Sequence, residues 1–134
     1  MPLGCLGYFD SKIVKYNQMS LIIVDHKLSE EDVKASLEEY SKYIKITVDL
    51  EKEIVIIGGE YHADAEKLLV EKFDSRRSSI WGGGYNVTTE QFEVNAMLNL
   101  KPSINDSLEV LDPKIRNRFL EVVKNKLGNI QSLT

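Results

Sequence analysis

Two segments in the middle of the chain, whose apolar residues follow a strand pattern, constrain its fold more than any other part of the sequence. Residues 44–50 alternate between apolar and polar side chains, which is the pattern of a β-strand with one buried face. Residues 54–57 are apolar at every position, so they predict a strand that is buried on both faces, in the centre of a sheet. Residues 49–52 lie between the two segments and predict a tight turn. The two strands are therefore expected to form an antiparallel hairpin.

Helices and a further strand are predicted on either side of this hairpin. Residues 21–24 form an apolar run that is typical of a buried strand. Ser29 is a good N-cap, and the apolar residues at helical spacing after it predict a helix at about residues 30–42. After the hairpin, residues 65–73 predict a second, shorter helix.

The C-terminal half begins with a predicted loop and continues with a strand and a helix. Residues 74–84 end in three glycines and predict a loop. Residues 91–100 alternate without a break between apolar and polar side chains, which predicts the clearest strand in the chain. A final helix is expected at residues 113–126, because Asp112 is a good N-cap and Gly128 follows just past the end.

The predicted order of elements is β-α-β-β-α-(β)-β-α, which indicates an α+β fold with helices packed on one face of a mainly antiparallel sheet. The other face would be polar with an apolar centre, as in a partner interface or the floor of a pocket. Residues 19–134 are expected to form this single domain, with residues 1–18 as a weakly ordered N-terminal extension and Met19 as an alternative or true start. An alternative interpretation places a short edge strand at residues 12–16.

The composition limits the classes of function. The chain has 21 acidic and 17 basic residues, and its C-terminal basic residues share a helix with Glu121, so no nucleic-acid partner is expected. A single cysteine argues against a disulfide framework and a cysteine-based zinc site. No apolar run approaches the length of a membrane span, so no membrane partner is expected and the protein is predicted to be soluble and cytoplasmic.

The clearest candidate site directly follows the central strand. Gly58 and Gly59 would let the backbone turn sharply, or let a ligand approach it closely. In an extended segment the alternate residues Glu60, His62 and Asp64 would converge, and two carboxylates with an imidazole suit acid–base catalysis or a divalent metal ion. The alternative is an ordinary strand-to-helix turn, in which Asp64 is the N-cap of the helix that follows.

Two further segments carry candidate ligand-binding residues. Trp81, followed by three glycines, suits a loop that closes over a flat ligand, and the alternative is a tryptophan that fills the edge of the core. The glycine run lacks the strand, helix and lysine of a phosphate-binding loop. Asn95 and Asn99 share one face of the predicted strand, where asparagine is disfavoured, which suggests hydrogen bonds to a ligand, to the Gly-Gly corner or to a partner strand. His26, in the loop after the first strand, is given no role.

Together these segments resemble a small prokaryotic family of uncharacterised proteins, a domain of unknown function. The resemblance rests on Gly-Gly-Glu-x-His-Ala-Asp at residues 58–64, Trp-Gly at 81–82, Ala-Met-x-Asn-x-x-Pro-Ser at 96–103 and Asp-Pro-Lys-Ile-Arg at 112–116. It covers about residues 20–127 and implies no particular activity. The chain departs from the family pattern in its three consecutive glycines and at Asn95. The resemblance groups six residues to be tested together: Glu60, His62, Asp64, Trp81, Asn99 and Arg116.

The leading functional hypothesis is a binding module for a small molecule or a protein, with a pocket near Glu60 and His62. In the first alternative, an enzyme uses His62 or Glu60 as acid–base group in a hydrolytic or metal-assisted reaction. The second alternative is a structural or regulatory homodimer without a ligand. A homodimer through a face or an edge of the sheet is expected, and the sequence identifies neither a cofactor nor a metal ion. The residues expected to bind a ligand are Asp64, Trp81, Asn99 and Arg116.

Overall fold

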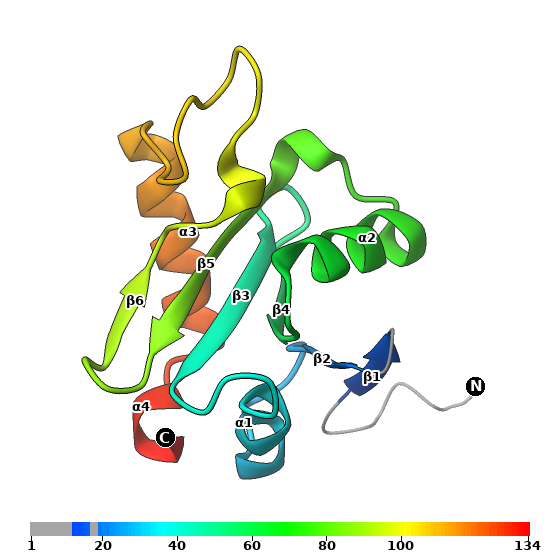
Figure 1. The fold of residues 1–134 in the computed structure, drawn as a ribbon, viewed down its shortest axis with the longest axis vertical. Coiled ribbons are helices and arrows are strands. Elements are labelled where there is room, and N and C mark those ends of the chain that lie inside the picture. The colour runs from blue at the N-terminus through cyan, green and yellow to red at the C-terminus, as the bar shows by residue number, and fades with distance from the viewer. Residues whose placement is uncertain (1–11, 17–18) are drawn as a thin grey trace.

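The computed structural model describes residues 12–16 and 19–134, and within them six strands form one sheet (Figure 1). The order across the sheet is β1-β2-β4-β3-β5-β6, and each neighbouring pair is antiparallel. The predicted α+β class and the antiparallel sheet are thus confirmed. The strands are β1 (Lys12–Tyr16), β2 (Met19–Ile23), β3 (Tyr43–Asp49), β4 (Ile54–Gly58), β5 (Ile80–Asn86) and β6 (Gln91–Glu93).

The first three helices follow the predicted chain order, and a short fourth helix was not predicted. The helices are α1 (Glu30–Ser36), α2 (His62–Phe73), α3 (Pro113–Lys126) and α4 (Ile130–Leu133), with short 3-10 turns at Arg77–Ser79 and Met97–Asn99. The bounds of α3 agree with the prediction, and Asp112 Oδ1 accepts a hydrogen bond from the Lys114 amide at 2.9 Å as expected of an N-cap. In the described part of the chain, no helix is both long and apolar enough to cross a membrane.

The central hairpin has the predicted form. Val48 of β3 lies opposite Val55 of β4, and the two strands pair from Asp49 and Ile54 onward. The Asp49 carboxylate fixes the turn, because its Oδ1 accepts hydrogen bonds from the amides of Glu51 at 2.9 Å and Lys52 at 3.1 Å.

The helices lie on both faces of the sheet, which corrects the expectation that they pack on one. Val55 and Ile57 of β4 contribute to a core that includes residues of α1, α3 and α4. Ile54 and Ile56 contribute to a second core, which is completed by residues of α2 (Figure 1). Because β4 is apolar at every position, both of its faces must be covered, and α2 covers the second one.

The three glycines of residues 82–84 lie in a strand, so the predicted loop at this point is wrong. β5 pairs with β3 over seven residues, from Tyr43 opposite Asn86 to Asp49 opposite Ile80. Glycine is rare within strands, but here it leaves room for other groups. A Cβ on Gly83 would lie 3.0 Å from the Phe119 ring, and a Cβ on Gly84 would lie 2.1 Å from the Tyr43 hydroxyl.

The long strand predicted at residues 91–100 is also wrong beyond its first three residues. β6 ends at Glu93, and a 3-10 turn at Met97–Asn99 follows. The chain turns here because the Asn99 side chain points inward and hydrogen-bonds to β5, as described below.

The N-terminal prediction lies partly outside the described residues. Residues 1–11 and 17–18 are not described, so the expected weakly ordered extension stays a prediction. Residues Lys12–Tyr16 form β1 and pair with β2 at the edge of the sheet. This agrees with the alternative interpretation of that segment as an edge strand.

Candidate functional site

The corner after β4 requires both of its glycines. Gly58 and Gly59 have φ angles of 94° and 87°, in the left-handed region that other residues rarely adopt. A Cβ on Gly58 would lie 2.8 Å from the Ser20 carbonyl oxygen, and one on Gly59 would lie 2.6 Å from a methyl group of Leu21. The corner thus brings α2 directly against the end of the central strand.

Two of the three candidate residues after this corner, His62 and Asp64, do not converge. The helix begins at His62 and its N-cap is Tyr61, so the predicted helix start and the N-cap role of Asp64 are wrong. Residues two apart on a helix point to nearly opposite sides, which separates His62 from Asp64. In the described residues no group of three His, Cys, Asp or Glu side chains could hold a metal ion. Asp64 instead lies in the first turn of α2, where its charge is favourable to the helix dipole.

His62 lies half-buried against β5. Its Nε2 is 2.7 Å from the Gly83 carbonyl oxygen, and because a carbonyl only accepts, Nε2 carries the proton. Its ring lies close over β5, since a Cβ on Gly82 would be 3.0 Å from Cδ2. Burial, together with the nearby charge of Lys45, lowers the pKa of His62 to about 4. His62 is therefore a neutral imidazole at physiological pH.

Next to His62 lies a group of residues that the sequence analysis did not identify. Ile44 and Ile46 of β3 belong to the first core, so Tyr43 and Lys45 project from the face that carries α2. The Lys45 ammonium is 4.8 Å from the centroid of the Tyr40 ring and 5.7 Å from that of Tyr43. We call Tyr40, Tyr43, Lys45 and His62 the lysine patch. The alternation of residues 43–46 could have indicated it, because it places a tyrosine and a lysine on the face opposite the core.

Burial changes the ionisation of this patch. Burial lowers the pKa of Lys45, and burial with the charge of Glu93 raises the pKa of Tyr43 to about 12. Tyr43 therefore keeps its hydroxyl proton at physiological pH. Tyr40 and Tyr43 also line an open cavity of about 590 Å³ beside the patch.

Of the remaining candidate residues, Trp81 and Asn99 have structural roles, and Arg116 lies away from the site. Trp81 is buried in the first core, as in the alternative interpretation, and the Lys101 ammonium is 4.9 Å from its ring centroid. The buried Asn99 amide replaces a neighbouring strand at Gly82: its Oδ1 accepts from the Gly82 N–H and its Nδ2 donates to the Gly82 carbonyl, both at 2.9 Å. Asn99 and His62 thus both hydrogen-bond to the backbone of β5, at Gly82 and Gly83. Arg116 lies on α3, across the sheet from His62, so it is not brought to this site.

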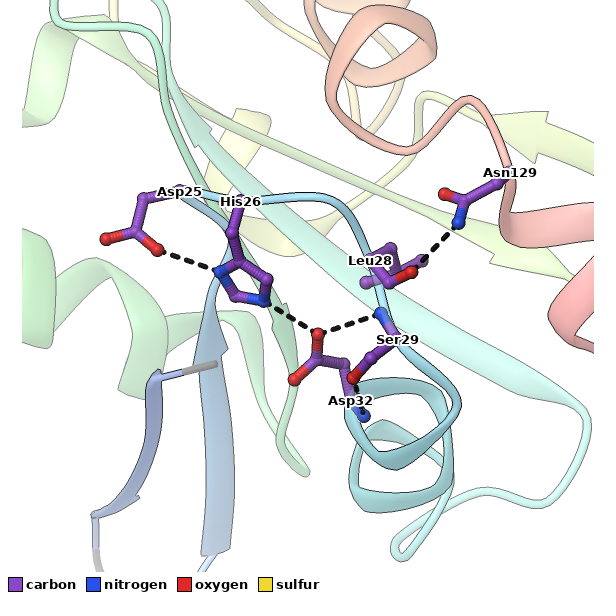
Figure 2. Close-up of polar contacts among 6 residues, drawn as sticks. All are labelled: Asp25, His26, Leu28, Ser29, Asp32 and Asn129. Carbon is purple, nitrogen blue, oxygen red and sulfur yellow. Dashed lines mark hydrogen bonds and ion pairs between the residues drawn. The ribbon is translucent and has the colours of Figure 1, made fainter. Parts of the chain in front are cut away.

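His26, to which the sequence analysis gave no role, forms a clamp with two carboxylates (Figure 2). Its Nδ1 is 2.8 Å from Asp25 Oδ1, and its Nε2 is 2.8 Å from Oδ2 of the fully buried Asp32. Asp32 also closes a capping box with Ser29 at the start of α1. Burial lowers the pKa of His26, but the two carboxylates outweigh it and raise the pKa above its usual value. The Ser-x-x-Asp spacing of residues 29–32 could have indicated this clamp. It predicts a capping box, which places Asp32 at the start of α1, next to the loop that carries His26.

The two histidines should make stability depend on pH in opposite directions. The folded pKa of His62 is depressed, so its contribution is present above about pH 6.5 and is lost as the pH falls through about 4, a change of up to about 3 kcal/mol. The folded pKa of His26 is raised, so its contribution is present below about pH 6.5 and is lost as the pH rises through the raised value. Urea unfolding of the wild type, His62→Gln and His26→Gln across this range checks both slopes. The acid-side loss should be smaller in His62→Gln only, and an unchanged slope in that variant would contradict the assignment.

Residues 22–126 match the model of a protein family that is described as proteins of unknown function, DUF5674. The chain belongs to this family. The match has nearly the extent that the resemblance predicted, and it contains the Gly-Gly corner, the lysine patch and residues 81–99. No significant match was found among curated proteins or among solved structures. The description of the family names no activity and no ligand.

Proposed function

We propose that the protein is a binding module for a small ligand that carries a carboxylate or phosphate group, with Lys45 beside His62 as the group that receives the anion. The observation that carries this proposal is the half-buried Lys45 ammonium, which has no carboxylate in ion-pair contact among the described residues. Removing a cation from water is costly unless an anion or other polar groups compensate. A bound anion would supply the missing charge.

The absence of a carboxylate at Lys45 is notable in this chain. Acidic residues outnumber basic ones by 21 to 17, so carboxylates are abundant. Other cations of the described residues reach carboxylates or backbone carbonyls, among them Arg76 with Glu51, Arg118 with Glu53 and Glu121, and Lys101 with Arg77 and Leu98. Lys45 instead lies over two tyrosine rings, which compensate its charge only in part.

The neighbours of Lys45 favour binding over acid–base catalysis. Tyr43 keeps its proton, so its hydroxyl is able to donate a hydrogen bond to an anion beside Lys45. With a pKa of about 4, His62 is a weak base at neutral pH, and its Nε2 bonds to the Gly83 carbonyl rather than to a carboxylate. The enzyme alternative with His62 and Glu60, like the structural homodimer without a ligand, is therefore less well supported than a binding site.

A titration followed by amide NMR signals tests the proposal. Benzoate and inorganic phosphate should shift the signals of residues 43–45 and 82–84 in a saturable way, whereas the uncharged benzamide should not. Lys45→Met keeps the apolar stem and removes the charge, so it should abolish these shifts. Lys34→Met, at an exposed position of α1, is the matched control and should retain them. Absent shifts in the wild type, or equal shifts in Lys45→Met, would overturn the proposal.

A further inference from the structure

The loop at residues 97–111 exposes an unusual number of large apolar side chains. Of the eight such side chains that are exposed in the described part of the chain, five lie in this loop. They are Met97 at 72%, Leu100 at 46%, Ile104 at 59%, Leu108 at 38% and Leu111 at 61% exposure. A concentration of this kind on a soluble domain indicates an interaction surface. Figure 1 shows the loop projecting beyond the end of the sheet.

Buried polar groups fix the loop in this conformation. The two N–H groups of Asn105 Nδ2 are shared among the carbonyls of Asn99, Ser107 and Glu109, which lie 2.8–2.9 Å from Nδ2, and Oδ1 accepts from the Leu111 amide at 2.9 Å. The inward positions are thus taken by hydrogen-bonded groups, so the apolar side chains remain outside. A surface that is already ordered loses little conformational entropy when a partner binds.

A cavity of about 360 Å³ opens between this loop and α2 and carries both signs of charge. Its apolar lining comes from Leu98, Leu100, Pro102 and Ile104, and its charged lining comes from Glu66, Arg77 and Lys101. The Lys101 ammonium donates to the carbonyls of Arg77 and Leu98, which leaves Glu66 and Arg77 as the charged groups available to a partner. Arg77 Nε is 3.8 Å from Glu66 Oε1, and the Arg77 side chain is 65% exposed, so the two groups form only a loose pair within one chain.

We infer that a second copy of this chain docks on the surface formed by Leu100, Pro102 and Ile104 with Glu66 and Arg77. An interface around a two-fold axis must be complementary to itself. Here apolar side chains would meet apolar side chains, and Arg77 of each copy would meet Glu66 of the other. A purely acidic or purely basic edge would instead favour a partner of the opposite charge. The homodimer expected from the sequence then uses this loop rather than a face or an edge of the sheet.

The oligomeric state of the full chain in solution tests the docking surface. By sedimentation equilibrium the wild type should be a dimer at micromolar concentrations, and Ile104→Glu should be a monomer with an unchanged far-UV circular dichroism spectrum. Tyr61→Glu, at a position that is 60% exposed beside α2, is the matched control and should remain a dimer. A monomeric wild type, or a dimeric Ile104→Glu, would overturn the inference.

Charge reversal tests whether the partner is a second copy in the stated orientation. Arg77→Glu and Glu66→Arg should each weaken self-association, because each creates two like charges across the interface. An equimolar mixture of the two variants should restore the dimer, since two basic residues of one copy then face two acidic residues of the other. A mixture that stays monomeric would overturn the proposed pairing, as would either variant that alone dimerises as well as the wild type.

Discussion

Gly83→Ala should destabilise the protein by about 3 kcal/mol or more, because an added methyl group has no space at this position. A Cβ on Gly83 would lie 2.1 Å from the Glu93 carbonyl oxygen and 3.0 Å from the Phe119 ring. Glu93 is part of β6, which pairs with β5, so its backbone cannot move away without loss of that pairing. Phe119 is fully buried in the first core and cannot turn aside without leaving a cavity.

Gly84→Ala is the matched control for this prediction. A Cβ at Gly84 would meet the end of the Tyr43 side chain, with the hydroxyl at 2.1 Å, and a half-buried side chain is able to rotate away. The expected loss is about 1–2 kcal/mol, with Tyr43 displaced from the lysine patch. Urea unfolding followed by circular dichroism measures both variants. A Gly83→Ala protein as stable as Gly84→Ala would show that β5 and β6 separate more easily than the contacts indicate.

The elements that could be predicted are those whose signal is local. The two-sided apolar run of β4 and the turn carboxylate of Asp49 specify a central hairpin within about a dozen residues. Asp112 and the apolar periodicity of α3 likewise specify that helix from its own sequence. The same apolar run should also have indicated helices on both faces of the sheet, since one covered face leaves half of its side chains in water.

β5 could not be predicted because the reason for its glycines lies elsewhere in the chain. Glycine disfavours a strand unless other groups occupy the space above it. At this strand those groups are His62, Phe119 and Tyr43, which come from α2, α3 and β3. No local pattern connects them with residues 82–84, so the sequence alone indicated a loop.

The candidate site inferred from the structure lies at the predicted corner but consists largely of other residues. The Gly-Gly corner does lie at the exit of the central strand, and His62 follows it and hydrogen-bonds to the Gly83 carbonyl of β5. The convergence of Glu60, His62 and Asp64 required an extended backbone, and α2 instead begins three residues earlier than expected. Lys45 was overlooked because a lysine on the polar side of a strand looks ordinary until its neighbours are known.

Asn99→Asp should lower the free energy of unfolding by about 3–5 kcal/mol at neutral pH, because the Asn99 amide makes the hydrogen bonds to β5 that a neighbouring strand would otherwise make. Its Nδ2 donates to the carbonyls of Gly82 and Leu108, both at 2.9 Å, in a fully buried place. A carboxylate oxygen there would face two carbonyl oxygens and would bury a charge without a cation. Asn95→Asp, at an exposed position of the same segment, is the matched control and should change the free energy of unfolding by less than about 0.5 kcal/mol.

The stability that Asn99→Asp loses relative to the wild type should decrease as the pH is lowered. Burial raises the pKa of the introduced carboxyl, and its protonated form can donate one of the two hydrogen bonds. Urea unfolding at neutral pH and at about pH 5 measures this change, and a deficit that does not depend on pH would show that the amide contributes through its shape rather than through its hydrogen bonds to the β5 backbone.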